Sequence, residues 1–383
     1  MNKPIISIFL PTLLIGGAEK SLVELANGLA GLGWRIQLLV MAKEGPLINE
    51  LNKNVDLIDL GCSSYRQAVF ALARHYKKHH PMVILTSVYA TGLAAVAAKI
   101  ISRYKPKVVI GAHNSLRAKF ERPDNVKDRY LLRPICKLLF PWADGFIAVS
   151  KSLALELETF SRLPKRRIRT IYNPVVSRKL FARAREKVAH PWLTDPAQRD
   201  FKTLISIGRL VEQKGFDVLL DALFLVRKHH DCRLIIVGDG PLRTDLEAIV
   251  TRLRLEENVD FVGWQENPYK FVTRSDLFVL SSRWEGLGNV LIEALACGCP
   301  VVATDCQYGP KEILEGGRYG ELVKVNNVSD LASKILSTLQ TNFHPAEVNA
   351  RKSRSLNFTV EVAVEQYSQY FSEIWLATDH TLA

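Results

Sequence analysis

Short apolar, β-branched runs alternate with amphipathic stretches along nearly the whole chain, and this alternation constrains the fold more than any other feature of the sequence. Runs this apolar are typical of strands buried on both faces, and the amphipathic segments between them predict helices that cover a parallel sheet. The candidate strands of the first half are residues 5–10, 35–40, 82–87, 107–112 and 145–150. Those of the second half are residues 203–208, 233–238, 259–263, 277–281 and 300–304. The pattern predicts an α/β protein with two Rossmann-like, doubly wound parallel sheets.

The length of the chain also favours two domains, because 383 residues exceed the usual size of one hydrophobic core. The first series of strands and helices ends near Asn173 and Pro174, before a polar, basic stretch. We therefore predict an N-terminal Rossmann-like domain over residues 1–173 and a C-terminal one over residues 174–362. A last helix at about 363–383 is expected to pack back on the first domain. Ligands of such sheets bind beyond the carboxyl ends of the strands, here in a cleft that the two domains face.

Cysteine usage and apolar patterning indicate a cytoplasmic protein. The six cysteines form no C-x-x-C pair and have no histidine at ligand spacing, so no metal is expected, and reduced, mostly buried thiols are the simplest interpretation. Lys3 precedes an apolar run as in a signal peptide, but Pro11 interrupts that run, which favours a buried first strand. No other apolar run approaches the length of a membrane span.

Three loops at predicted strand ends could carry chemistry. Gly16 and Gly17 follow the first strand and open a helix, where bare backbone can approach a phosphate, although Gly-Gly turns are common and the G-x-G-x-x-G fingerprint of dinucleotide binding is absent. Arg209 and Lys214 lie on one loop and could neutralise a diphosphate, unless they are simply a solvated basic loop. His113 ends a strand, where a neutral imidazole could bind a substrate hydroxyl or play a purely structural part.

The segment 281–300 carries two glutamates, Glu285 and Glu293, on either side of a helix start. A capping box does not fit, because Glu293 lies one or two positions beyond the third helical residue. Gly286 and Gly288 keep the loop bare, so the backbone N–H groups at the helix start can meet an anion, helped by the helix dipole. The pattern predicts a phosphate site flanked by acceptors for hydroxyl groups.

Several segments, in this order along the chain, resemble the retaining glycosyltransferases of family 4, which have the GT-B fold: GGAEKS, IYNP, GRLVEQKG, FVGWQENPYKFVTRSDLFVLSSRWEGLGNVLIEALACGCPVVAT and GPKEIL. The resemblance runs from about residue 5 to the last helix, and the pair Glu285 and Glu293 is its most specific part. It implies a bacterial surface-polysaccharide enzyme, for example of lipopolysaccharide or O-antigen biosynthesis, with residues 1–173 on the acceptor side and residues 174–362 binding the nucleotide sugar. The implied reaction moves a sugar from a UDP-hexose or UDP-N-acetylhexosamine to a glycan hydroxyl, with retention and with no metal or other cofactor.

The resemblance also implies roles for individual residues. Arg209 and Lys214 match the cations that hold the donor diphosphate, Glu285 a glutamate that holds a sugar hydroxyl, and Glu293 one that holds the ribose. His113 matches a histidine that contacts the 6-position of the sugar, which makes His113, Arg209, Lys214 and Glu285 the catalytic group. The other expected donor contacts are Gly16, Gly17, Val262, Gly263, Trp264, Gly286, Leu287, Gly288, Asn289 and Val290. The chain departs from many relatives in Lys20 and Gly288, where arginine and proline are common.

The positive charge of the chain is concentrated in one region. Between Lys99 and Lys187 there are 22 Lys and Arg against 7 Asp and Glu, whereas the rest of the chain has 29 against 32. Within this region Arg129, Arg133 and Lys137 lie four residues apart among apolar side chains. Such a stretch either docks on an anionic leaflet or is a core helix with a solvated face, interrupted at Pro134. We expect peripheral contact with the inner face of the plasma membrane and an acceptor glycan carried on a lipid such as undecaprenyl diphosphate.

Other function classes fit less well. A glycoside hydrolase also uses two carboxylates but has no need for a phosphate site. A non-hydrolysing nucleotide-sugar epimerase would share the two-domain architecture. A basic nucleic-acid-binding protein would rest on charge alone, since the chain has no RNA or DNA motif, so no nucleic acid partner is expected.

Overall fold

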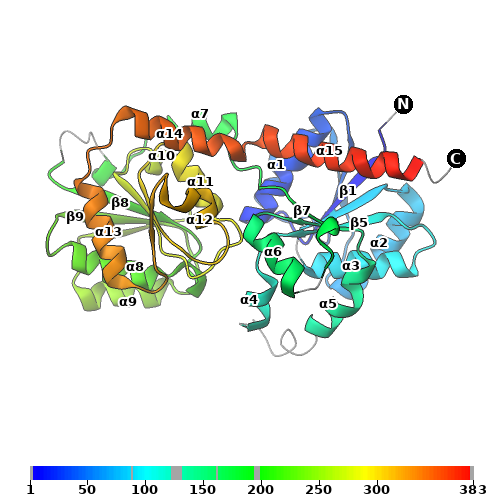
Figure 1. Ribbon diagram of the computed structural model, residues 1–383, viewed down its shortest axis with the longest axis horizontal. Coiled ribbons are helices and arrows are strands. Elements are labelled where there is room, and N and C mark those ends of the chain that lie inside the picture. Colours follow the sequence, from blue (N-terminus) through cyan, green and yellow to red (C-terminus); the bar gives the residue numbers. More distant parts are fainter. Residues whose placement is uncertain (1–2, 88, 122–131, 161–162, 194–198, 380–383) are drawn as a thin grey trace. The chain divides into compact units, whose positions relative to one another are not determined.

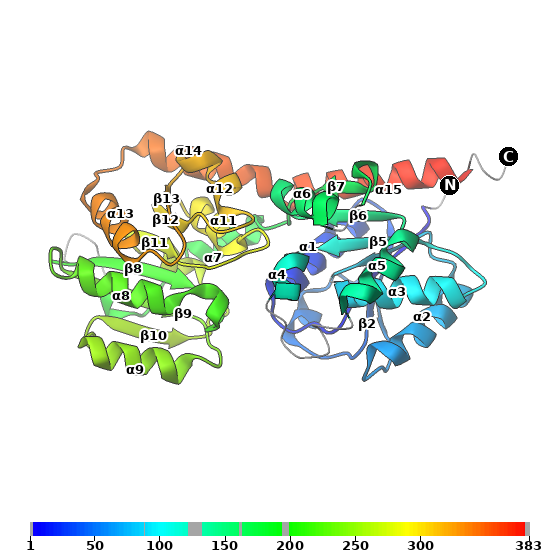
Figure 2. The same cartoon turned by 60° about the horizontal axis from the view of Figure 1, so that its bottom comes forward.

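The computed structural model describes the whole chain except residues 1–2, 88, 122–131, 161–162, 194–198 and 380–383. The contacts between residues divide the chain into two compact units, one of residues 1–174 with 360–383 and one of residues 175–359. Each unit contains its own parallel sheet with helices on both faces (Figures 1 and 2).

The sheet of the first unit has seven strands in the order β3-β2-β1-β4-β5-β6-β7, and each neighbouring pair is parallel. The central strands are buried on both faces, as their continuous apolar character requires. In chain order, the strands are β1 (Ile5–Leu10), β2 (Arg35–Val40), β3 (Val55–Asp59), β4 (Val83–Thr86), β5 (Lys107–Ala112), β6 (Gly145–Ala148) and β7 (Ile168–Thr170).

Helices of the first unit are α1 (Gly17–Gly31), α2 (Tyr65–His79), α3 (Tyr89–Ile101), α4 (Leu116–Glu121), α5 (Arg133–Leu139), α6 (Lys151–Phe160) and α15 (Val360–Asp379). Helices α2 and α3 pack together on one face of the sheet, and α1 and α15 pack together on the other (Figure 1). The contact between α1 and α15 is close, because a side chain at Gly28 would overlap Val364. The rings of Trp34 and Phe371 meet edge to face with their centroids 6.3 Å apart.

The sheet of the second unit has six parallel strands in the order β10-β9-β8-β11-β12-β13. They are β8 (Lys202–Ile207), β9 (Cys232–Val237), β10 (Val259–Gly263), β11 (Leu277–Leu280), β12 (Val301–Thr304) and β13 (Glu321–Val323). The helices are α7 (Arg178–Ala184), α8 (Phe216–Val226), α9 (Arg243–Leu253), α10 (Tyr269–Val272), α11 (Asn289–Ala296), α12 (Pro310–Ile313), α13 (Val328–Gln340) and α14 (Pro345–Ser355). Helix α8 packs against α9 and α13, whereas α11 packs against α14 (Figure 2).

The predicted fold class is confirmed, with one systematic difference. The pattern of apolar runs did not predict β3, β7 and β13, which lie at edges of their sheets. An edge strand pairs on one side only and is more exposed, so it needs neither the length nor the continuous apolar character of a central strand. Two of the three have only three residues.

Each sheet reverses its strand order at one place, between β1 and β4 in the first unit and between β8 and β11 in the second. Loops that leave neighbouring strands in opposite directions open a crevice there, which is the usual ligand position in open α/β sheets. The six cysteines form no disulfide, and five of them are buried. Among the described residues, no helix combines the length and the apolar character that a membrane crossing requires.

Candidate active site

Two loops meet at the strand-order reversal of the second unit. One follows β8 and contains Arg209 and the 3-10 helix η7 (Glu212–Lys214), and the other follows β11 and runs from Ser281 to the start of α11. The sheet therefore brings the predicted cations and the predicted helix start to neighbouring positions on one edge. Arg209 itself is exposed, and its carbonyl oxygen accepts a hydrogen bond from the Val211 N–H.

Lys214 and Glu285 form an ion pair at this edge. The Lys214 Nζ lies 2.5 Å from the Glu285 Oε1, which also accepts a hydrogen bond of 2.7 Å from the Ser282 hydroxyl. The two side chains are only 16% and 7% exposed, so water screens their attraction less than it would on the surface. The carbon chain of Lys214 lies over Gly208, where an added Cβ would stand 3.2 Å from three of its carbons. Gly208 has no side chain and therefore leaves the room that the Lys214 side chain needs to reach Glu285.

Backbone contacts hold the two loops together. The Ser281 hydroxyl donates to the Lys214 carbonyl oxygen at 2.8 Å, and the Arg283 N–H donates to the Gln213 carbonyl oxygen at 2.7 Å. Gly215, with φ 60°, ends the η7 turn in the left-handed region, and a side chain there would overlap the Ser281 carbonyl oxygen. The relative position of Lys214 and Glu285 is therefore fixed by the loops as well as by the ion pair.

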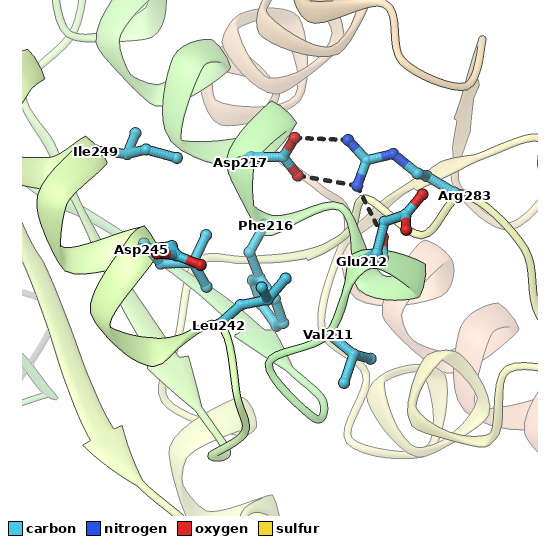
Figure 3. A pocket seen from close by; sticks show the side chains of 9 residues that line it. Val211, Glu212, Phe216, Asp217, Leu242, Asp245, Ile249 and Arg283 are labelled. Atoms are coloured by element: carbon cyan, nitrogen blue, oxygen red, sulfur yellow. Dashed lines mark hydrogen bonds and ion pairs between the residues drawn. The ribbon is translucent and has the colours of Figure 1, made fainter. Parts of the chain in front are cut away.

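Arg283 is a residue that the sequence motifs did not single out. Its guanidinium donates to both carboxylate oxygens of Asp217, at 3.0 and 2.6 Å, and to the carbonyl oxygen of Glu212 at 2.7 Å (Figure 3). This bidentate pair ties the loop after β11 to the first turn of α8. It lies at the rim of a pocket of about 250 Å³ whose apolar part includes Phe216 and Leu242. None of the described residues that line this pocket is a predicted donor contact.

The start of α11 is built by glycine. Gly288 precedes Asn289, the first helical residue, with φ 92° and ψ 56°, and no side chain caps the helix. The first N–H groups of a helix point beyond its start, where an anion can meet them, and here the Leu291 N–H donates back to the Gly288 carbonyl oxygen at 2.9 Å. Proline is confined to φ near −65°, so this backbone conformation excludes proline at residue 288. Gly309 backs this loop, because a side chain there would overlap the carbonyl oxygen of Leu287.

Glu293 lies on α11, one turn beyond the loop. The Tyr269 hydroxyl donates to the Glu293 Oε1 at 3.1 Å. Burial raises the pKa of Tyr269, and the negative charge of Glu293 raises it further. The tyrosine is therefore a neutral donor that orients the carboxylate, and the sequence motifs did not single it out.

Val262, Gly263 and Trp264 stand at the end of β10, an outer strand separated from β8 by β9. Pairing with β9 is irregular between Phe261 and Gly263, which has φ 70°, and the Trp264 side chain is exposed. The Gly238 N–H donates to the Gly263 carbonyl oxygen at 2.8 Å. This segment thus shares the carboxyl edge of the sheet with Lys214 and Glu285 but does not touch the ion pair directly.

The remaining predicted residues belong to the first unit. Gly16 precedes α1 in an extended conformation, with φ −150°, and Gly17 is the first residue of the helix. His113 follows β5 and is buried. Burial lowers its pKa to about 4, and the nearby Asn173 side chain raises the pKa by a smaller amount. Neither ring nitrogen of His113 makes a hydrogen bond of normal geometry. The imidazole is consequently neutral at physiological pH.

Within the described part of the chain, no group of three or more His, Cys, Asp or Glu side chains is placed to hold a metal ion. Asp217 and Glu285 instead face cations, Arg283 and Lys214 respectively.

The arrangement of two parallel-sheet units with loops gathered at strand-order reversals is that of a GT-B glycosyltransferase. HepE from Anabaena in complex with UDP and glucose has this fold, with a TM-score of 0.77 and 22% identity over 97% of this chain and 100% of that one. The chain belongs to the glycosyltransferases of family 4 and group 1, because the Glycosyltransferase Family 4 model matches residues 15–179 and the Glycosyl transferases group 1 model matches residues 195–354.

Two curated relatives are similar over part of their length. The N-acetylgalactosamine-N,N'-diacetylbacillosaminyl-diphospho-undecaprenol 4-alpha-N-acetylgalactosaminyltransferase of Campylobacter jejuni is 34% identical over 58% of this chain and 59% of that protein. The lipopolysaccharide core biosynthesis glycosyltransferase LpsE of Rhizobium meliloti is 32% identical over 54% of this chain and 58% of that protein. The matched regions thus span less than two thirds of either relative.

Proposed function

We propose that the protein is a retaining glycosyltransferase that moves a sugar from a UDP-hexose or UDP-N-acetylhexosamine to a hydroxyl group of a glycan acceptor. The observation that carries this proposal is the buried Lys214–Glu285 pair beside the glycine-built start of α11, at the strand-order reversal of the second unit. This edge offers a cation, a carboxylate and the positive end of a helix within two neighbouring loops, which suits a sugar joined to a diphosphate.

Each part of the donor has a residue suited to it. In this assignment Arg209, Lys214 and the first N–H groups of α11 bind the diphosphate, and Glu285 accepts a hydrogen bond from the sugar. Glu293, oriented by Tyr269, accepts from the ribose. The backbone at Val262 to Trp264 receives the nucleobase.

The two glutamates are engaged with their neighbours, Glu285 with Lys214 and Ser282, and Glu293 with Tyr269, which argues against a carboxylate nucleophile. We assign a front-face displacement instead. The bond from the anomeric carbon to the diphosphate oxygen breaks, the acceptor oxygen bonds to that carbon on the same face, and its proton passes to the departing phosphate. Arg209 and Lys214 stabilise the charge that develops on the leaving group, so no metal enters the proposal. Turnover unchanged by EDTA would support this, and turnover restored only by Mg²⁺ would contradict it.

A lipid-linked acceptor at the inner face of the plasma membrane fits the surface of α5 and the 3-10 helix η3 (Phe140–Trp142). Arg133 and Lys137 are exposed there, and so are the apolar Leu138, at 69%, and Trp142, at 59%. Exposed apolar and basic side chains on one short segment suit an anionic leaflet. Helix α5 begins at Arg133, with Pro134 in its first turn, and Arg129 lies outside the described residues.

The names of the two curated relatives point the same way. One includes a diphospho-undecaprenol-linked glycan and the other names lipopolysaccharide core biosynthesis. We therefore propose that this chain acts in cell-surface polysaccharide biosynthesis on a glycan carried by a lipid diphosphate.

A panel of UDP- and GDP-sugars, assayed for nucleotide release with and without a lipid-linked glycan, tests the proposal. A transferase releases UDP mainly when acceptor is present, and proton NMR of the product reports the retained anomer. An epimerase would instead interconvert the donor sugar without acceptor. Tight, salt-dependent RNA binding with no affinity for any sugar nucleotide would contradict the proposal altogether.

A further inference from the structure

We propose that Thr86 and Ser87, at the end of β4, form with His113 a binding site for carbohydrate hydroxyl groups and help to select the sugar that the protein accepts. This inference rests on the proposed glycosyl transfer. Thr86 and Ser87 lie outside the glycosyltransferase motifs of the chain.

The position of β4 is the first reason. It lies between β1 and β5, so its end borders the strand-order reversal of the first unit, with Gly16 and Gly17 following β1 on the other side. This is the place in an open parallel sheet where ligands bind. Thr86 is paired with Ile110 in β5, whose following loop carries His113.

The local geometry brings the ends of β4 and β5 together. A side chain at Gly111 would overlap the Thr86 carbonyl oxygen, and its Cβ would stand 3.2 Å from the His113 Nε2. The end of β4 and the His113 ring therefore lie beside the same backbone position, Gly111. The Tyr89 hydroxyl donates to the Asn114 carbonyl oxygen at 2.9 Å, which ties the start of α3 to the loop after β5.

The hydroxyl groups themselves are the strongest observation. Thr86 and Ser87 are both 0% exposed, and neither hydroxyl oxygen has a hydrogen-bond partner. Buried polar groups in folded proteins nearly always have one, because an unsatisfied hydroxyl costs on the order of 1–3 kcal/mol. Ser7, a buried serine of the same sheet, shows the usual situation, since its hydroxyl bonds to Gln37 at 3.3 Å and to His75 at 3.2 Å. Two adjacent unsatisfied hydroxyls at a ligand-binding edge indicate that a ligand supplies the missing partners.

The side chains of Thr86, Ser87 and His113 indicate which class of ligand the site binds. Serine and threonine hydroxyls and a neutral imidazole each offer both a donor and an acceptor, which matches the hydroxyl groups of a sugar. Because burial keeps His113 uncharged, the site favours a neutral group over a phosphate or carboxylate. The hydroxyls could belong to the donor sugar or to the acceptor glycan, and kinetics distinguishes these sources.

Thr86→Val and Ser87→Ala remove the hydroxyl groups and leave the shape of the side chains nearly unchanged. Because these hydroxyls have no partner in the protein, the two variants should keep or raise the thermal midpoint of unfolding. Ser7→Ala is the matched control, which should lower the midpoint because a partnered buried hydroxyl is lost, without altering sugar kinetics. Midpoints of Thr86→Val and Ser87→Ala that fall as far as that of Ser7→Ala would overturn the inference.

The kinetic readout identifies the source of the hydroxyls. If the site holds the acceptor, the double variant, Thr86→Val with Ser87→Ala, should have an acceptor KM about tenfold higher and an unchanged rate of slow UDP-sugar hydrolysis. If it holds the donor sugar, UDP-sugar hydrolysis should fall about tenfold while the affinity for UDP alone is kept. Wild-type kcat/KM for both substrates in the double variant would refute the site.

Saturation-transfer NMR with free glucose, galactose and N-acetylglucosamine tests the site without any transfer reaction. If the wild-type protein turns over no UDP-sugar but its monosaccharide signal is lost in the double variant, the proposed function fails and the hydroxyl site stands. A wild-type protein that gives no signal with any of the three sugars, or a signal that the double variant retains, would overturn the inference.

Discussion

The ammonium of Lys214 lies 2.5 Å from the carboxylate of Glu285, although the two residues are 71 positions apart in the chain. The pair joins the loops that follow β8 and β11, and it is largely buried. One consequence is that the two residues have a shared structural role in addition to the separate roles proposed for them with the donor. Variants at the two positions therefore need to be compared in pairs.

Lys214→Met should lower the free energy of unfolding by about 3 kcal/mol, because it leaves the buried Glu285 carboxylate without its cation. The double variant Lys214→Met with Glu285→Gln should recover most of that stability but not the turnover, since the diphosphate still lacks its cation. Urea unfolding and UDP release measured on the same samples check both statements. Full turnover in the double variant would remove Lys214 from the donor site.

Arg209→Ala should reduce turnover tenfold or more with little change in stability, because the side chain is exposed and its loss leaves no buried group unpaired. Arg252→Ala on α9 is a control for removal of an exposed arginine from the same unit. Equal turnover in the two variants would refute the assignment of Arg209 to the diphosphate.

Glu293→Gln should weaken the binding of UDP itself, whereas Glu285→Gln should leave UDP affinity nearly intact and reduce the step that depends on the sugar. The reason is that the first carboxylate is assigned to the ribose and the second to the sugar. Calorimetric titration of both variants with UDP separates the two roles. Equal losses of UDP affinity would show that this division is incorrect.

Gly288→Ala should cost about 1–2 kcal/mol of stability, because φ 92° is unfavourable for a residue with a Cβ, and should also lower turnover by displacing the start of α11. Gly316→Ala is the matched control, since Gly316 also has a positive φ, 70°, and open space where a Cβ would stand. The control should lose similar stability and keep its turnover. Similar turnover in both variants would separate the helix start from donor binding.

Replacing Arg129, Arg133 and Lys137 together by glutamine should reduce binding to anionic vesicles and activity on a lipid-linked acceptor, yet spare donor hydrolysis. Attraction to the leaflet should also fall with salt, as the Debye length shrinks from about 10 Å at 0.1 M to about 3 Å at 1 M. Co-sedimentation with neutral and with anionic vesicles, at low and high salt, measures this. Lys165→Gln with Arg166→Gln removes exposed charge from the same basic region but leaves Arg133 and Lys137 in place, and should have a smaller effect. Binding that ignores both lipid charge and the triple substitution would contradict the docking surface.

The buried histidines should make stability depend on pH. Burial lowers the pKa of His75 to about 4, helped by the charges of His79 and Lys78, and the pKa of His113 is also lowered to about 4 by burial. The unfolded chain binds protons at both residues below about pH 6.5 and the folded chain does not, so stability is complete above about pH 6.5 and is lost as the pH falls toward 4. His75→Gln should flatten this dependence by up to about 3 kcal/mol between pH 7 and pH 4 in urea unfolding. An unchanged slope would show that His75 is protonated in the folded state.

The sequence by itself determined the fold class. A strand buried on both faces needs a continuous apolar run, and a helix that covers it needs apolar residues at helical spacing, so both can be recognised from neighbouring residues. It also identified the family through motifs at strand ends, including Glu285 and Glu293 around a helix start. The pattern of apolar runs did not predict the edge strands β3, β7 and β13, since a strand with one partner can be short and partly polar.

Only the tertiary structure decided which side chains meet. The order of the parallel strands in the sheet brings three pairs of side chains together. They are Lys214 with Glu285, Arg283 with Asp217, and Tyr269 with Glu293. Likewise, the sequence around Thr86 and Ser87 does not show whether their hydroxyl groups have hydrogen-bond partners. Residues distant in the chain decide whether a buried hydroxyl group has a hydrogen-bond partner, so only the tertiary structure shows it.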